Sequence, residues 1–147
     1  MMKKQNQILA ITFLSFFVLM FSCKKDESEE MIDILTSKTW KYGLEDINTL
    51  TNPSGSNNVY FAAPKCEQDD TFTFKTDGTV LRSYGNTKCD GNTATSKTVN
   101  YSFNKTTKEL VIDGVKYTVT EENKTQFKFY AVVPNASGFN NVIYLLQ

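Results

Sequence analysis

Residues 110–119, Leu-Val-Ile-Asp-Gly-Val-Lys-Tyr-Thr-Val, contain the pattern that decides the fold. Apolar residues occupy every second position on both sides of a central Asp-Gly pair. A period of two is typical of a strand that buries one face. Asp-Gly between two such runs favours a type I′ turn, because both central residues of that turn need a positive φ. The stretch therefore predicts an antiparallel hairpin.

The same alternation recurs from residue 37 onward. Strands are predicted at residues 38–43, 58–62, 70–76, 79–85, 97–103, 108–113, 115–121, 125–133 and 140–146. Short strands joined by tight turns are typical of an antiparallel up-and-down meander, so we expect an all-β domain. We expect the meander to form a small β-barrel of about eight to nine strands. Residues 29–36 place four apolar side chains on one side and predict a short N-terminal helix.

A second Asp-Gly pair, at residues 77–78, joins two further strand-forming runs. If these two residues alone form the turn, paired residues have numbers that sum to 155, which sets Phe74 opposite Leu81. The same register, extended outward, sets Cys66 opposite Cys89, although a bulge would shift it by one residue. The sequence therefore predicts a disulfide between these two cysteines, in a compartment that permits one.

The first residues have the layout of an export signal. Lys3 and Lys4 precede an apolar run at residues 8–21, and Cys23 follows closely. That run has 14 residues, and a membrane-spanning helix needs about 20. Cysteine at the cleavage point is typical of a bacterial lipoprotein, and the alternative is an ordinary secretory signal with a coincidental cysteine. We expect residues 1–22 to be a lipoprotein signal peptide, with acyl chains such as palmitate on the cysteine anchoring the protein in a membrane.

The predicted mature chain has an acylated, charged and flexible tether at residues 23–30 and one domain at residues 31–147. It holds 14 Lys and Arg against 16 Asp and Glu, so it lacks the basic excess that nucleic-acid binding needs. The sequence contains no histidine, which excludes Ser-His-Asp and Cys-His catalysis and histidine-based zinc sites. We therefore expect no enzyme activity, no catalytic residue, no cofactor, no metal site and no nucleic-acid partner.

Nine aromatic residues form the candidate ligand-binding set. They are Trp40, Phe72, Phe74, Tyr101, Phe103, Tyr117, Phe127, Phe129 and Tyr144. These side chains either line a cavity or fill one, because a barrel of about eight strands is packed solid or holds one small ligand. For the tryptophan, a structural plug under the barrel is the alternative to a pocket floor.

Polar stretches at residues 48–58 and 85–97 are predicted loops, where either a ligand mouth or plain solvated turns would lie. The carboxylate pairs Asp69-Asp70 and Glu121-Glu122 are predicted to be surface charges or turn caps, because adjacent strand residues point to opposite faces.

Residues 35–41, Leu-Thr-Ser-Lys-Thr-Trp-Lys, resemble the opening of lipocalin-like domains in bacterial lipoproteins. There a short helix leads into the first strand through a tryptophan that plugs one end of the barrel. Residues 66–74, followed by Asp-Gly-Thr at 77–79 and then by Cys89, look like the central hairpin of that family. The resemblance covers residues 31–147 and implies an antiparallel barrel and, at most, an apolar ligand site.

The charged run after Cys23 resembles the signal by which some Gram-negative bacteria move lipoproteins to the outer surface. This implies an outer-membrane lipoprotein of the cell envelope, either periplasmic or surface-exposed.

Two functions follow from these features. The first is a membrane-anchored lipoprotein whose lipocalin-like barrel binds a small apolar or amphipathic molecule. The alternative is a solid-packed structural or interaction module, an accessory or adhesion subunit of a cell-envelope complex with no small-molecule ligand.

Overall fold

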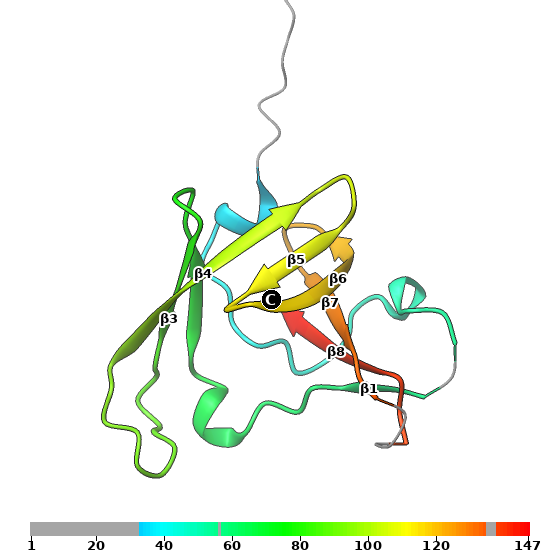
Figure 1. Cartoon of the computed structure of the whole chain (residues 1–147). Coiled ribbons are helices and arrows are strands. Elements are labelled where there is room, and N and C mark those ends of the chain that lie inside the picture. The colour runs from blue at the N-terminus through cyan, green and yellow to red at the C-terminus, as the bar shows by residue number, and fades with distance from the viewer. Residues whose placement is uncertain (1–32, 56, 135–137) are drawn as a thin grey trace, which may run out of the picture. The chain divides into compact units, whose positions relative to one another are not determined.

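A computed structural model describes residues 33–55, 57–134 and 138–147 (Figure 1). The predicted signal peptide, the lipid site at Cys23 and the tether at residues 23–30 lie outside the described residues. In the part of the chain that the structure describes, no helix is long and apolar enough to span a membrane.

Eight strands form one mixed sheet. They are β1 (Asn58–Tyr60), β2 (Thr71–Phe74), β3 (Thr79–Ser83), β4 (Ser96–Asn104), β5 (Glu109–Ile112), β6 (Val115–Glu122), β7 (Phe127–Val132) and β8 (Asn141–Leu146). Their order across the sheet is β1-β8-β7-β6-β5-β4-β3-β2. The predicted meander is confirmed from β2 to β8. Strand β1 does not belong to the meander. It pairs in parallel with β8, although the six other strands lie between the two in sequence.

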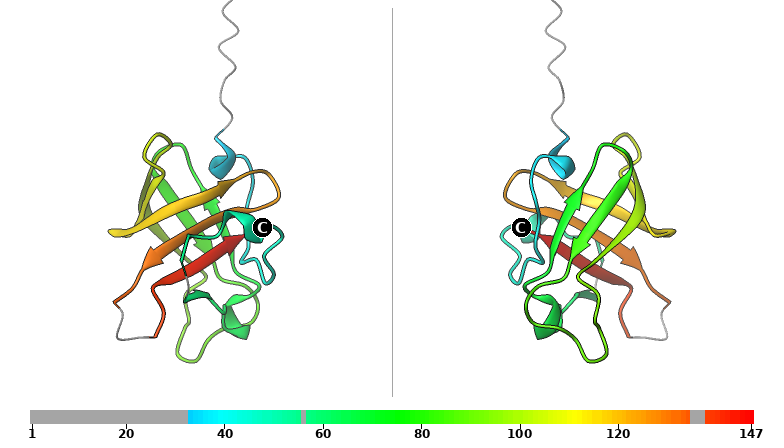
Figure 2. Two further views of the ribbon diagram at one scale, coloured as in Figure 1. Left: turned by 90° about the vertical axis from the view of Figure 1, so that its right-hand side faces the viewer. Right: turned by 90° about the vertical axis from the view of Figure 1, so that its left-hand side faces the viewer.

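The sheet curls, so that β2 and β3 (green) face β7 and β8 (orange and red) across the core (Figure 2). Its edge strands are β1 and β2, and no ladder of the described strands joins them. The closed barrel that we expected from the sequence is therefore not confirmed as a continuous ladder.

Residues 38–43 were predicted to be a strand, and that prediction is wrong. The structure has two isolated bridges there, one from Trp40 to Phe72 of β2 and one from Tyr42 to Leu146 of β8. The backbone groups of alternate residues in an extended segment face opposite sides. One residue of the segment therefore bonds to β2 and two bond to β8 or the residue after it, which is too few for a ladder.

The predicted helix at residues 29–36 is not seen. Among the described residues of that range, Ile34–Thr36 form a single 3₁₀ turn, η1, and the Asp33 carboxylate caps it by accepting a hydrogen bond from the Leu35 amide at 3.1 Å. The carbonyl of Leu35 accepts a hydrogen bond of 2.8 Å from the indole Nε1 of Trp40. Both side chains are fully buried, so the tryptophan closes this end of the core.

The two Asp-Gly turns differ. At residues 113–114 both φ angles are positive, and Ile112 pairs directly with Val115, as a type I′ turn requires. Before β3, only Gly78 has a positive φ, and Phe74 pairs with Val80 instead of Leu81. The predicted register is therefore wrong by one residue, because the turn contains three residues with glycine in the left-handed position.

The predicted disulfide between Cys66 and Cys89 is present. Cys66 lies in a short 3₁₀ turn, η3 (Lys65–Glu67), and Cys89 lies in the loop after β3. Both cysteines are outside the β2–β3 ladder, so the error of one residue in register does not prevent them from meeting.

A fully buried lysine holds the loop before β1 against the sheet. Lys128 of β7 lies between two core residues in sequence, so it points to the outer face. Its ammonium donates hydrogen bonds to Asp46 at 2.8 Å, Thr51 at 2.9 Å and Asn52 at 3.0 Å. The first part of the predicted polar loop, residues 48–52, therefore packs across the outside of β7.

Two carboxylates balance the buried ammonium. Asp46 lies 2.8 Å from the Lys128 Nζ, and Glu121 of β6 lies 3.6 Å from it. Burial by itself raises the pKa of Asp46, but hydrogen bonds from Lys128, from the Asn48 amide and from two further side chains outweigh it and lower this pKa to about 2. The loop thus supplies the charge that keeps a lysine inside the protein.

We expect Lys128→Met to lower the free energy of unfolding by about 3–5 kcal/mol, because it leaves two buried carboxylates without their counter-ion. The matched control is Lys116→Met, which breaks an exposed pair with Glu109 at 3.3 Å. Its effect should stay below about 1 kcal/mol. Urea unfolding at neutral pH measures both variants, and equal effects would contradict this account of the loop.

Candidate functional site

The structure brings all nine candidate aromatic residues into one core cluster. Trp40, Phe74, Phe127 and Phe129 are buried within it, and Phe72, Tyr101, Phe103, Tyr117 and Tyr144 pack against it while partly exposed. The sequence prediction missed Tyr42 and Phe61. Tyr42 lies two residues after Trp40 in an extended segment, so the same alternation contains the signal that would have found it.

The buried part of this core is filled by ring contacts. Phe127 lies 6.1 Å from Trp40 and 5.8 Å from Phe103, measured between ring centroids. Phe129 lies 6.1 Å from Phe127 on the same strand. Offset and edge-to-face contacts of this length stabilise aromatic clusters.

The rings of the core differ in exposure. Trp40 and Phe127, at the end covered by η1, are fully buried. Phe103, which contacts Phe127, is partly exposed at the same end. Five further partly buried rings contact one another, and we call this group the tyrosine end. It consists of Tyr42, Phe61, Phe72, Tyr117 and Tyr144.

The five rings of the tyrosine end form a continuous row. Tyr42 contacts Phe72 at 4.8 Å and Phe61 at 5.4 Å. Tyr144 contacts Phe61 at 5.0 Å and Tyr117 at 5.5 Å. The row draws residues from β2, β6, β8 and the segments before and after β1 to one apolar surface.

Three hydroxyl groups at the tyrosine end have no hydrogen-bond partner among the described residues: those of Tyr42, Tyr117 and Tyr144. By contrast, the Tyr101 hydroxyl donates to the Lys75 carbonyl at 2.8 Å. Burial raises the pKa of Tyr42 to about 12, and it also raises the pKa of Tyr117 and that of Tyr144. A partly buried phenol without a partner retains the capacity to donate and to accept one hydrogen bond.

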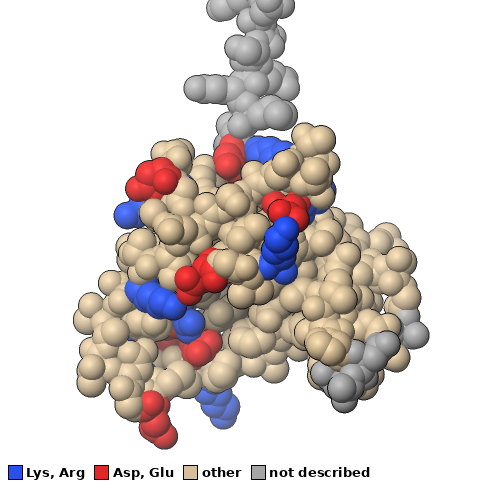
Figure 3. Space-filling model, in the orientation of Figure 1, with Lys and Arg blue, Asp and Glu red and all other residues tan. Residues whose placement is uncertain are grey.

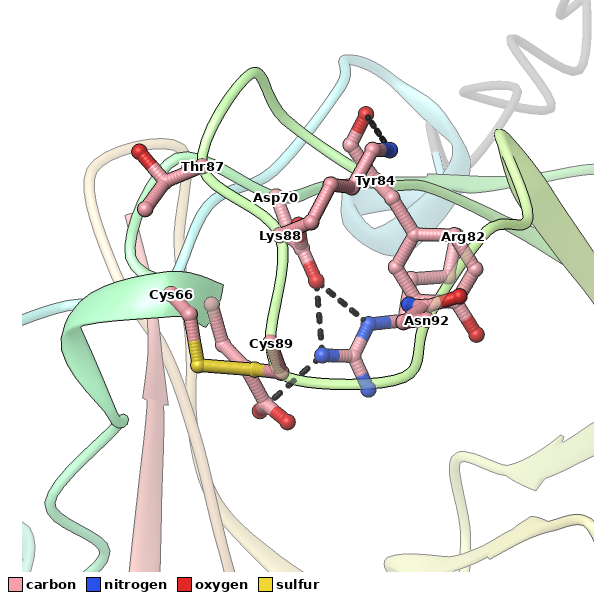
Figure 4. A pocket seen from close by; sticks show the side chains of 9 residues that line it. Cys66, Asp70, Arg82, Tyr84, Thr87, Lys88, Cys89 and Asn92 are labelled. Carbon is pink, nitrogen blue, oxygen red and sulfur yellow. Dashed lines mark hydrogen bonds and ion pairs between the residues drawn. A yellow bond between two sulfur atoms is a disulfide. The ribbon is translucent and has the colours of Figure 1, made fainter.

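An arginine lies beside the tyrosine end, where its charge lowers the pKa of Tyr42 against the larger, raising effect of burial. The Arg82 guanidinium of β3 is held at 2.6 Å by Asp70 and at 2.9 Å by Glu67, and lies 5.7 Å from the Phe72 ring centroid. Its carboxylate partners occupy the donors that face them, so it is fixed in place (Figure 4).

A hollow of about 120 Å³ lies between Arg82 and the disulfide, with Lys88 and Asn92 on its other wall. Its lining is mostly polar, unlike that of the tyrosine end. The loop at residues 85–97, which we predicted to be a ligand mouth or a solvated turn, provides part of this wall.

Asp70 and Glu121 are not the surface charges that the sequence predicted. Asp70 is 1 % exposed because it pairs with Arg82, and Glu121 is 8 % exposed because it faces Lys128. Neither carboxylate of the first pair caps its own turn. Each holds the distant loop after β3: Asp70 accepts the Gly85 amide at 2.8 Å, and Asp69 accepts the Thr87 amide at 3.0 Å.

Gly85 is required where this loop crosses the carboxylates. A Cβ at this position would lie 2.1 Å from the carboxyl carbon of Asp69, so a larger residue fits only if the Asp69 side chain or the loop moves.

Within the described ranges, no group of three His, Cys, Asp or Glu side chains is arranged to hold a metal ion. Comparison of the chain with protein-family models, with curated proteins and with solved structures finds no match. The geometry of the tyrosine end is therefore the basis for the proposal below.

The raised pKa of Tyr42 predicts an alkaline loss of stability. Folding favours the neutral phenol, so this contribution is complete below pH 10, the ordinary pKa, and is lost as the pH rises towards 12. In Tyr42→Phe the free energy of unfolding should fall less steeply over that range than in the wild type. Denaturant unfolding at a series of pH values measures this, and identical slopes would refute the burial of that hydroxyl.

Proposed function

We propose that this protein is a membrane-anchored lipoprotein that binds a small amphipathic molecule at the tyrosine end. The observation that carries the proposal is the set of three unpartnered hydroxyl groups, of Tyr42, Tyr117 and Tyr144, at the partly exposed end of an aromatic core. Ligand sites combine an apolar lining with a few polar groups that fix orientation, and the tyrosine end has both.

The ring contacts support one position for such a ligand. Phe127, Phe129 and Trp40 contact one another or a shared neighbour, so the inner core is occupied by protein. The ligand therefore lies across the row of five outer rings, with its apolar part on Phe61 and Phe72 and its polar group against the tyrosine hydroxyls. A molecule with one flat or chain-like apolar part and a hydroxyl, amine or carbonyl group fits this description.

We also propose that the curled sheet functions as a lipocalin-like barrel, completed by residues 40–43. Support comes from the hydrogen bonds of this segment: the Trp40 amide donates to the Phe72 carbonyl at 2.8 Å, and the Gly43 amide donates to the Leu145 carbonyl at 2.9 Å. The segment thus contacts the edge strand β2 and the strand β8, which lies next to the other edge. Its tryptophan is fully buried, as a plug would be.

The anchor is proposed to be the acylated Cys23, in the outer membrane of a cell envelope. Its support is the order of the basic, apolar, cysteine and charged segments in the first 30 residues. A disulfide between Cys66 and Cys89 is compatible with an oxidising compartment outside the cytoplasm.

The second candidate function is a solid-packed interaction module. It is favoured by the dense ring contacts around Phe127, which need no ligand to be stable. The two candidates differ in whether the tyrosine end binds an amphipathic probe.

The test uses N-phenyl-1-naphthylamine, an apolar fluorescent amine, with the purified protein. We expect saturable binding that weakens about fivefold in Tyr144→Phe, because one hydrogen bond is worth about 1 kcal/mol while the ring remains. The matched control is Tyr130→Phe on the same pair of strands, outside the tyrosine end, which should leave the affinity unchanged. Equal affinities in all three proteins, or no saturable binding, would refute the proposed site and favour the interaction module.

A further inference from the structure

The loop before β1 displays an unusual set of exposed aliphatic side chains. Leu44 is 70 % exposed, Ile47 is 59 % exposed and Leu50 is 94 % exposed. They account for three of the six large, exposed apolar side chains among the described residues, and they lie within seven positions. We call this group the aliphatic loop.

The exposure follows from how the loop is held. Asp46, Thr51 and Asn52 turn inward to bind the buried Lys128 ammonium, which also bonds the Asn48 carbonyl. Because the polar side chains fill the inner side, the intervening apolar ones are left outside. The backbone is fixed as well, since the Ile47 amide donates to Gln126 at 3.3 Å.

Glu45 is the one exposed ionised side chain within the aliphatic loop, and the chain that follows Asp46 is uncharged. Between Asp46 and Lys65 the sequence contains no Asp, Glu, Lys or Arg. In the space-filling view, the lobe on the right, where Figure 1 shows the turn of η2 (Thr49–Thr51), has neither blue nor red atoms on the visible face (Figure 3). A charge-free surface loses little on transfer out of water, whereas ionised side chains would oppose that transfer.

The position of Cys23 in the sequence indicates that a lipid bilayer is the apolar medium nearest to this surface. Nine residues separate Cys23 from Asp33, where the described domain begins. Ten residue steps of extended chain span at most roughly 36 Å, so an acylated cysteine keeps the domain within that distance of a bilayer. The bilayer interface is then present at high local concentration throughout the life of the protein.

We propose that the aliphatic loop docks into the bilayer interface, with Leu44, Ile47 and Leu50 inserted among the lipid headgroups and upper acyl chains. This inference rests on the proposed lipid anchor, which supplies the proximity. Docking is driven by apolar burial without basic residues, so it should be insensitive to salt and to the fraction of anionic lipid. The loop adds a second contact to the anchor and restricts how the domain rotates on its tether.

The test introduces a fluorescent reporter into the loop. Full-length protein carrying Leu50→Trp is incorporated into phosphatidylethanolamine and phosphatidylglycerol vesicles that contain lipids with brominated acyl chains, which quench tryptophan on contact. The native Trp40 is fully buried and gives the baseline in the unmodified protein. The matched control is Val115→Trp, at the first residue of β6, which is 50 % exposed.

We expect strong quenching at position 50, weak quenching at position 115, and no change when salt is raised. Adding Leu44→Ser and Ile47→Ser to Leu50→Trp should weaken docking, since moving one such side chain fully into an apolar medium corresponds to roughly ten- to a hundredfold in partitioning. The hydrogen bonds of Lys128 go to Asp46, Asn48, Thr51 and Asn52, so these substitutions remove none of them.

Equal quenching at positions 50 and 115 overturns the proposal. So does a spectral shift of the position-50 reporter that needs no lipid and grows with protein concentration, because it shows that a second copy covers the loop. The mass of the purified chain reports separately whether Cys23 is acylated. If it is not, the anchor fails, and quenching of the unacylated protein at high vesicle concentration still decides for or against docking of the loop.

Discussion

The buried ammonium of Lys128 is the constraint that organises the first third of the described domain. A charge removed from water needs counter-charges and acceptors around it, and the sheet alone supplies only Glu121. The remainder comes from residues 46–52, which must therefore cross the outer face of β7. That crossing delivers the chain to the open edge of β8, where Asn58–Tyr60 pair in parallel. One lysine thus explains both the path of the loop and the direction of the first strand.

The sequence predicted those parts of the fold that depend on local pattern. Alternation identified every strand from β2 to β8, and the positive φ required at Asp113 and Gly114 identified a type I′ turn. The register of the β2–β3 hairpin was wrong, because Asp-Gly also fits a three-residue turn in which only the glycine is left-handed. The parallel strand and the isolated bridges were beyond sequence reasoning, since they depend on where distant segments meet.

The candidate site divides in the same way. Side-chain alternation placed all nine aromatic residues on the core face, and the structure agrees. Alternation shows which face of a strand is buried, but not how deeply each side chain on that face is buried. It could therefore not predict that Phe127 is fully buried while Tyr144 is partly exposed. Nor does it report what covers the outer face. Lys128 has the pattern of an exposed residue, and only the partners that come from the loop show that it is fully buried.

The bridges at residues 40–43 have a consequence for the order of folding. The Lys41 amide donates to the Gln147 carbonyl and the Gly43 amide to the Leu145 carbonyl, so each bond joins positions about a hundred residues apart. Contacts of such sequence separation form late, because the entropy of closing the intervening chain opposes them until other contacts exist. During synthesis or export, residues 41–43 therefore stay without these partners until residues 145–147 are available. Pairing with β8 therefore completes the domain, because only then do Lys41 and Gly43 gain their backbone partners.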